Sequence, residues 1–203
     1  KGISSTYSPT TTKLSKDDWQ LVLVNKQHPV PEDYTVTLGK IKGSMKCDVR
    51  IIDDLMDMMQ AAKRDSINLV VCSPYRDYNR QTVLFDRKID YYMEEGHSYM
   101  EAYKLASMTV TVPGASEHQI GLALDIVSTT YSGLEIGFGE TVAGRWLKEH
   151  CDEYGFILRY PEGKEYITGI QYEPWHFRYV GKEAAVQIME RDITLEEFIE
   201  ELE

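Results

Sequence analysis

Two short segments that lie far apart in the sequence carry the side chains with which this chain could bind a metal ion. The first, 116–125, contains His118 and Asp125, and the second, 173–176, ends in His176. Catalytic zinc sites usually take three protein ligands and leave one position open for water or substrate. Because neither segment alone closes such a site, a metal centre here requires a fold that brings the two segments together.

Glu173 is left over when His118, Asp125 and His176 are assigned as ligands. A carboxylate beside a metal centre can take a proton from water and hand it to a leaving amine. Simpler interpretations exist for each residue. A single histidine near an apolar strand is usually a hydrogen-bonded structural residue, Asp125 suits a strand-end cap, and Glu173-Pro174 suits a turn. The spacing alone therefore leaves both a metal site and structural roles open.

The charge balance excludes several classes of function. The chain has 22 Lys and Arg against 33 Asp and Glu, which gives a formal charge of −11. No broad basic surface is available for nucleic acid or for an anionic membrane. Hydrophobic residues make up 42% of the 203 residues, enough for the core of one domain. No run of about 18 apolar residues suggests a transmembrane helix.

The N-terminal stretch has a different composition from the rest of the chain. It begins with Lys1 and is small, polar and rich in Ser and Thr through residue 12. This composition predicts a flexible linker over residues 1–18, of the kind that follows a removed anchor or signal, and one folded domain over residues 19–203.

Apolar periodicity and turn residues predict an α+β fold. Helices are expected over 48–64, 78–93, 98–108, 141–154 and in two acidic stretches that follow Gly181 and Thr194. Strands are expected over 21–24, 68–72, 121–128, 156–160 and 175–180. Gly155 suits a left-handed helix cap. Cys72 lies in an apolar run and is predicted to be a buried thiol, and no CxxC pair supports a thiolate zinc site.

Residues 116–125 read SEHQIGLALD, which resembles the SxHxxGxAxD motif of the LAS metallopeptidases. This group is named for lysostaphin, D-alanyl-D-alanine carboxypeptidases and sonic hedgehog. Residues 173–176 read EPWH and match its second motif, ExxH. The stretches 113–123, 154–161 and 172–181 are similar to the vancomycin-resistance peptidases of the VanY and VanXY kind. The resemblance covers the chain from Leu21 to its C-terminus, with both motifs complete and in order.

The resemblance implies a LAS fold, in which a small antiparallel sheet flanked by helices carries a zinc site. His118, Asp125 and His176 match the ligands of one Zn²⁺ per chain, and Glu173 matches the catalytic base. Residues 73–81 look like the family's SxYRxxxxQ segment, in which Arg76 corresponds to the arginine that holds the scissile carbonyl oxygen.

Three further residues match or adjoin the family's substrate pocket, namely Ser116, Gln81 and Trp175. A serine in a turn or a buried tryptophan needs no ligand to explain it. One departure concerns Pro74, where family members commonly have Gly before the arginine. Proline fixes φ and removes a donor, so a stiffer approach to Arg76 is expected.

By resemblance, the substrate is a peptidoglycan precursor stem peptide that ends in D-Ala-D-Ala, from which a zinc D,D-carboxypeptidase removes the terminal D-Ala, an activity associated with glycopeptide resistance. The same site suits a D,D-dipeptidase or an L,D-carboxypeptidase, and a different class of protein, a non-catalytic zinc-containing wall-binding module, is the remaining alternative. We expect no nucleic-acid partner, no membrane insertion of this chain, and a location at the extracytoplasmic face of a bacterial membrane or in the cell wall. The sequence leaves the oligomeric state open.

Overall fold

The computed structural model describes residues 13–202. The predicted linker, residues 1–18, lies mostly outside these residues. Within the described part of the chain, no helix is long and apolar enough to cross a membrane.

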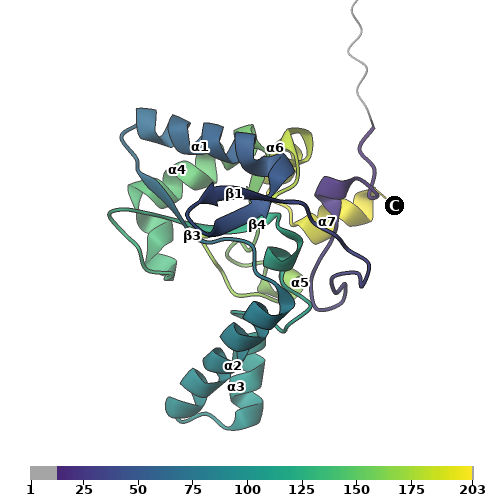
Figure 1. Cartoon of the computed structure of the whole chain (residues 1–203), viewed down its shortest axis with the longest axis vertical. Coiled ribbons are helices and arrows are strands. Elements are labelled where there is room, and N and C mark those ends of the chain that lie inside the picture. The colour runs from purple at the N-terminus through teal and green to yellow at the C-terminus, as the bar shows by residue number, and fades with distance from the viewer. Residues whose placement is uncertain (1–12, 203) are drawn as a thin grey trace, which may run out of the picture.

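A four-stranded antiparallel sheet forms the centre of the molecule (Figure 1). Its spatial order is β3-β4-β6-β5. The strands are β3 (Leu69–Ser73), β4 (Ala123–Ser128), β5 (Phe156–Leu158) and β6 (His176–Tyr179). The sheet and its helices confirm the predicted α+β class, and every strand pair is antiparallel as expected.

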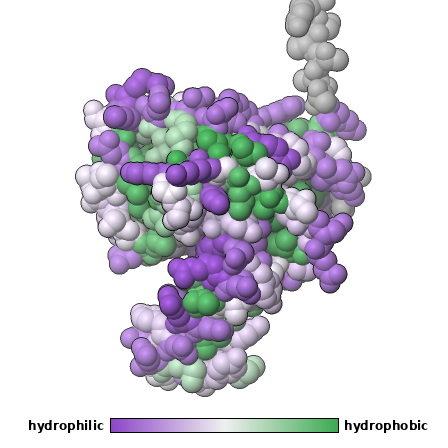
Figure 2. Space-filling model, viewed as in Figure 1, coloured by the Kyte–Doolittle hydropathy of each residue, from purple (hydrophilic) through white to green (hydrophobic). Residues whose placement is uncertain are grey.

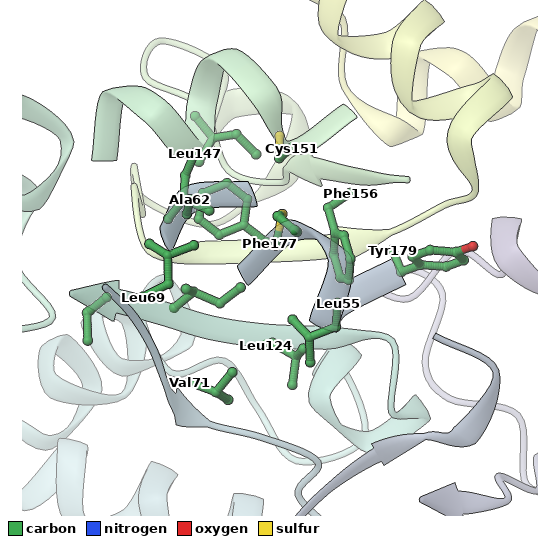
Figure 3. Packing of buried hydrophobic residues seen from close by; sticks show 14 of the residues in the cluster. Leu55, Ala62, Leu69, Val71, Leu124, Leu147, Cys151, Phe156, Phe177 and Tyr179 are labelled. Carbon is green, nitrogen blue, oxygen red and sulfur yellow. The ribbon is translucent and has the colours of Figure 1, made fainter. Parts of the chain in front are cut away.

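Helices from both halves of the chain pack around the sheet. The longer ones are α1 (Ile52–Arg64), α4 (Val142–His150), α6 (Lys182–Glu190) and α7 (Leu195–Glu201), and a single turn, α5, spans Glu165–Thr168. The main core joins α1, α4 and the strands, and its members meet in one cluster in Figure 3. Leu55 from α1, Leu124 from β4 and Phe177 from β6 are fully buried there. A second cluster joins α6 and α7 to Leu21.

Two further helices form an arm that projects from the body (Figure 1). They are α2 (Tyr78–Glu94) and α3 (Tyr99–Ser107), and they pack against each other through a small cluster of their own, made of Phe85, Ile89, Ala102 and Ala106. A capping box begins α3, since Ser98 Oγ accepts from the Glu101 backbone and Glu101 accepts from the Ser98 backbone.

Several predicted elements are shorter than expected, and one is wrong. Residues 21–24 form no strand. A 3-10 turn covers Trp19–Leu21, and the carbonyls of Gln20 and Val22 accept hydrogen bonds from Arg178 Nη2 instead of from a neighbouring strand. The predicted helix from residue 48 begins at Ile52, after a 3-10 turn (Val49–Ile51) that Asp48 caps.

A hairpin made of β1 (Leu38–Lys42) and β2 (Met45–Asp48) was not predicted. Gly39 and the lysines of these strands hide the alternation that marks a strand. The predicted helix over 141–154 divides into α4 and a 3-10 turn, Cys151–Tyr154, and Gly155 ends it with φ 85° as expected.

Cys72 is exposed, which corrects the prediction of a buried thiol. It lies on β3, an edge strand whose alternate residues Leu69 and Val71 are buried while Val70 and Cys72 are exposed. A four-residue apolar run on an edge strand therefore buries only every second side chain.

Candidate metal centre and active-site cleft

Strand pairing places two of the predicted ligands side by side. Asp125 on β4 lies directly opposite His176 on β6 in the antiparallel register. Directly opposite residues project from the same face of a sheet. His176 Nδ1 lies 3.2 Å from Asp125 Oδ1. The neighbours Leu124 and Phe177 belong to the apolar core, so alternation along both strands separates the ligands from the core.

The third ligand comes from a 3-10 turn, η3 (Glu117–Ile120), just before β4. Gly121 ends this turn with φ 73°, and a Cβ there would meet the Asp48 backbone nitrogen at 3.0 Å. The left-handed conformation and the close backbone both favour glycine at this position. The turn directs His118 Nε2 to within 3.3 Å of Asp125 Oδ1.

The three side chains fit a metal ion. One ligand atom from each of His118, Asp125 and His176 lies within 4.8 Å of the others, and all three residues are buried. Among the described residues, the buried His118 Nε2 and Asp125 Oδ1 have no hydrogen-bond partner. Buried polar atoms are normally satisfied, so these atoms point to a missing ligand. Two imidazoles and a carboxylate are a donor set that zinc prefers.

Each histidine is held by a second partner on its far side. His118 Nδ1 donates to the Pro74 carbonyl at 2.8 Å, and His176 Nε2 lies 3.3 Å from Glu117 Oε2. Such bonds fix which ring nitrogen is free for a metal. Proline retains its carbonyl, so the departure at Pro74 leaves this contact intact. The segment after it is fixed as well, because Arg76 N donates to the His118 carbonyl at 3.1 Å.

The surroundings of the two histidines shift their pKa values in opposite directions. Burial and the nearby Arg76 lower the pKa of His118 to about 4, which keeps this imidazole neutral. Burial alone lowers the pKa of His176, but hydrogen bonds to Asp125 and Glu117 outweigh it and raise that pKa to about 9. Burial alone raises the pKa of Asp125, yet the adjacent His118 and His176, whose ring nitrogens lie 3.3 and 3.2 Å from Oδ1, hold it well below its usual value. The site therefore keeps an ionised carboxylate between two imidazoles.

Glu173 lies beside the ligands as expected. Its Oε2 is 3.7 Å from His176 Nδ1, and its side chain is 11% exposed. Burial, with the charge of Asp125, raises the pKa of Glu173 to about 8, despite the opposing effect of His176. A carboxylate with a raised pKa holds a transferred proton more tightly, which suits a general base.

Arg76 projects into the same site from the segment before α2. Its Nη2 lies 3.8 Å from Asp125 Oδ2, and its side chain is 12% exposed. Arg76 is therefore not a solvent-exposed cation at the start of α2. The helix is capped by its neighbour Asp77, which accepts from Arg80 N at 2.7 Å. Among the described residues, the buried Arg76 Nε has no partner, so the guanidinium retains capacity for a ligand.

These groups line a cleft of about 510 Å³ that runs between the sheet and α2. Ser116 and Trp175 lie in its wall as expected. Gln81 does not, because it is fully buried and its Nε2 donates to the carbonyls of Val110 and Thr111 at 2.7 and 3.1 Å. Gln81 was expected to contact the substrate directly. It instead supports the wall of the cleft from behind.

Comparison with known proteins agrees with this geometry. The family model described as VanY, D-alanyl-D-alanine carboxypeptidase, matches residues 44–182. A D-alanyl-D-alanine carboxypeptidase from Enterococcus faecalis is 40% identical over 195 residues, which cover 96% of this chain and 71% of the relative. The chain belongs to the VanY D-alanyl-D-alanine carboxypeptidase family.

Two solved structures of VanY-type enzymes are similar in fold as well as sequence. One is a vancomycin-resistance D,D-pentapeptidase VanY variant in complex with Zn(II), with a TM-score of 0.83, 41% identity, and coverage of 90% of this chain and 99% of that chain. The other is VanYB in complex with D-alanine-D-alanine, with a TM-score of 0.84, 40% identity, and coverage of 90% and 98%. The chain is a zinc metallopeptidase of the LAS fold, and its metal is Zn²⁺.

Within this VanY-type cleft, sequence reasoning missed Thr111. Its backbone has φ 66°, an unusual conformation for a β-branched residue, and its side chain lines the cleft. The residue is 5% exposed, and its Oγ1 has no hydrogen-bond partner among the described residues. Strain of this kind collects at functional sites. No sequence pattern signals a threonine with positive φ.

Sequence reasoning also missed Glu117. This carboxylate is fully buried between two buried arginines, Arg159 and Arg178. Burial raises its pKa, but the two guanidinium charges outweigh that effect and hold the pKa well below its usual value. Removing one partner of such a buried group costs about 3–5 kcal/mol. A second carboxylate in the motif, next to His118 and additional to Asp125, was the available signal.

Proposed function

We propose that this enzyme removes the terminal D-Ala from peptidoglycan precursor stem peptides that end in D-Ala-D-Ala, an activity associated with glycopeptide resistance. The observation that carries the proposal is the placement of Glu173 and Arg76 beside a three-ligand metal centre in the wall of an open cleft. When bound, Zn²⁺ acts as a Lewis acid that polarises the scissile carbonyl and lowers the pKa of water.

Glu173 performs the proton transfers. Its carboxylate lies close enough to His176 Nδ1 to face the metal centre without being one of the three clustered ligands. It takes the proton of the attacking water and passes it to the nitrogen of the leaving D-Ala. Burial raises its pKa, which helps the carboxyl group to hold the proton between the two steps.

Arg76 stabilises the charge that develops on the carbonyl oxygen. The guanidinium is positioned by the backbone bond to His118 and by Asp125, and it has a buried donor to spare. A fixed donor in a shielded site stabilises an oxyanion more strongly than the same group in water.

The free carboxylate of the substrate needs donors of its own. Ser116 and Thr111 are candidates, since both residues carry a hydroxyl and line the same cleft as Arg76. Trp175 and Tyr160 supply apolar surface for the D-Ala methyl groups in the same cleft. We propose direct substrate contact for Ser116, Thr111 and Trp175.

A D,D-dipeptidase, an L,D-carboxypeptidase and a non-catalytic wall-binding module remain as outcomes of one experiment. Release of D-Ala is measured from a pentapeptide, a tetrapeptide and free D-Ala-D-Ala, each with and without a chelator. The proposal expects the fastest release from the pentapeptide and none with the chelator. Fastest release from the tetrapeptide would indicate an L,D-carboxypeptidase, and fastest release from the dipeptide would indicate a D,D-dipeptidase. Tight binding without release would indicate a non-catalytic binding module.

We also propose that the enzyme acts at the extracytoplasmic face of a bacterial membrane or in the cell wall. Support comes from the composition of the N-terminal stretch and from the chemistry of the proposed substrate, a wall precursor. Fractionation of cells that express the natural protein tests this, and recovery in the cytosolic fraction would contradict it.

A further inference from the structure

The two ligand histidines are oriented by partners of different kinds. His118 is held by a backbone carbonyl, that of Pro74. His176 is held by a side chain, because its Nε2 faces Glu117 Oε2 at 3.3 Å. When Nε2 carries the proton and donates it to Glu117, the lone pair of Nδ1 faces Asp125 and the metal centre. The orientation of His176 thus depends on where the Glu117 carboxylate lies.

Glu117 is in turn held by two arginines. Its Oε1 accepts from Arg159 Nε at 2.7 Å and from Arg178 Nη1 at 2.9 Å, which leaves Oε2 for His176. Arg178 is anchored to backbone, since it also donates to the carbonyls of Tyr179, Gln20 and Val22. Within residues 13–202, the Arg159 guanidinium donates hydrogen bonds to carboxylates and to no backbone carbonyl, so its position depends mainly on Glu117 and Glu196.

The second carboxylate that holds Arg159 comes from the C-terminal helix. Glu196 in α7 accepts two hydrogen bonds from Arg159, from Nη1 to Oε2 at 2.8 Å and from Nη2 to Oε1 at 2.7 Å. Asn25 Nδ2 donates to the same Glu196 Oε1 at 3.2 Å. Planar pairing of this kind fixes both position and angle of a guanidinium. Two carboxylates and two guanidinium groups then balance in charge within this buried cluster.

Loss of Glu196 would change the balance at Glu117. Arg159 would keep one carboxylate partner, Glu117. Its two freed guanidinium nitrogens would turn towards Glu117, because no other acceptor among the described residues is available to them. The Glu117 carboxylate would then be drawn away from His176 Nε2, since attraction between charges is strong where water is excluded. A change on α7 would in this way reach a metal ligand on β6.

We propose that Glu117 and Glu196 are positioning residues for the metal ligand His176, and that the C-terminal helix α7 thereby sets the affinity of the site for zinc. The inference rests on the zinc peptidase function proposed above. Neither Glu117 nor Glu196 lines the cleft. Both residues act through Arg159 and His176.

The test is the affinity of the whole chain for Zn²⁺, measured by competition with a chromogenic chelator. Glu196→Gln removes the charge and keeps the shape, and we expect about tenfold weaker binding, in the range seen when outer partners of metal ligands are lost. Glu196→Asp keeps the charge and is expected to lose less. The matched control is Glu201→Gln, which removes an exposed carboxylate of the same helix from its pair with Arg191. Equal affinity for wild type, Glu196→Gln and Glu201→Gln would overturn the proposal.

A double-mutant cycle separates positioning from a general loss of stability. If Glu196 acts through Glu117, Glu117→Gln combined with Glu196→Gln weakens zinc binding no more than Glu117→Gln alone. Additive losses would show that Glu196 acts by another route and would overturn the chain of contacts. Thermal unfolding of the metal-free variants is measured alongside, and Glu196→Asp supplies the affinity comparison if Glu196→Gln does not fold.

A spectroscopic measurement reports on His176 itself. In zinc-loaded wild type, ¹⁵N NMR of the imidazole is expected to show the proton on Nε2, and Glu196→Gln should shift that resonance while Glu201→Gln does not. An unchanged His176 resonance with weaker zinc binding would also refute the proposal. Failure of the proposed function is recognised separately, because wild type would then bind no zinc or release no D-Ala.

Discussion

Strand β3 borders two hollows of similar size that differ in the ionisable groups they contain. Its residues 69–71 line a cavity of about 630 Å³ shared with α1 and the β1–β2 hairpin. Its end, from Cys72 and Ser73 onward, lines the cleft of about 510 Å³ that holds the metal centre. The larger hollow is walled mainly by apolar side chains such as Met45, Met56 and Met59, and hydrophobic residues gather on the face below α1 in Figure 2.

The contrast shows that size and apolar character do not identify the active site here. A large apolar pocket is the usual first guess for a binding site. In this enzyme the smaller cleft holds the buried ionisable groups whose pKa values are strongly shifted, among them His118, Glu173 and His176. Convergent groups with shifted pKa values are the better guide. The following changes test that assignment, from the largest expected effect to the smallest.

The largest effect is expected from loss of a metal ligand. His118→Ala should reduce bound zinc well below one per chain and reduce turnover to background, because two remaining ligands rarely hold zinc. Metal content after dialysis, measured by atomic absorption, checks this together with D-Ala release. His28→Ala is the matched control, since His28 is exposed and lies outside the cleft. Full zinc content in His118→Ala would mean that the ligand set is misassigned.

The next largest effect concerns the general base. Glu173→Gln should lower kcat by about 10²–10⁴-fold, the usual contribution of a positioned base, while zinc stays near one per chain. Steady-state kinetics and metal analysis on the same preparation separate this result from that of His118→Ala. Retention of more than a few per cent of wild-type turnover would rule out Glu173 as the base.

Arg76 comes third. Arg76→Ala should lower kcat by about 10²–10³-fold, the cost of removing one oxyanion donor. The control is Arg87→Ala, because Arg87 is exposed on α2 and does not line the cleft. If Arg76→Ala raised KM and left kcat unchanged, the guanidinium would bind the ground state of the substrate and the oxyanion role would be refuted.

Thr111 should have a smaller effect. Thr111→Val keeps the β-branched shape and removes the hydroxyl, so loss of one hydrogen bond to substrate should raise KM about 2–10-fold. Thr111→Ser restores the hydroxyl and is expected to recover most of the wild-type KM. Equal KM values for wild type and Thr111→Val would show that the unpaired hydroxyl does not contact substrate.

The smallest effect is expected in the apolar hollow. Met59→Lys places a charge in its wall without blocking the cleft, so kcat/KM for the pentapeptide should stay within about twofold of wild type, as for most changes outside the site. Thermal unfolding checks that the variant is folded. A tenfold fall in kcat/KM for a folded Met59→Lys would show that the larger hollow takes part in catalysis.

The sequence predicted the metal centre better than it predicted the secondary structure around it. Alternation along β4 and β6 is short, but the motifs name the residues that must meet, and the register of Asp125 against His176 then follows. The strand expected at 21–24 failed because a side chain, Arg178, binds its carbonyls. Cys72 was misplaced because an apolar run does not tell an edge strand from a central one.

Contacts between side chains that are far apart in the sequence could not be predicted, for a physical reason. Glu117, Arg159 and Glu196 are charged residues scattered along the chain, and charge of this kind is usually at the surface. Only the folded chain shows that they neutralise one another inside it. Gln81 was wrongly expected in the cleft for a similar reason. The sequence pattern does not show which face of a helix points into the cleft and which packs against the chain.

The arm of α2 and α3 has a consequence for how this molecule can change over evolutionary time. Its four buried hydrophobic residues form a core of their own, and α2 lines the cleft through Arg80, Leu84 and Lys88. A unit with its own core opens and closes separately from the rest of a protein. The part of the arm beyond Lys88 can therefore change in length or sequence over evolution with little effect on the residues that line the cleft.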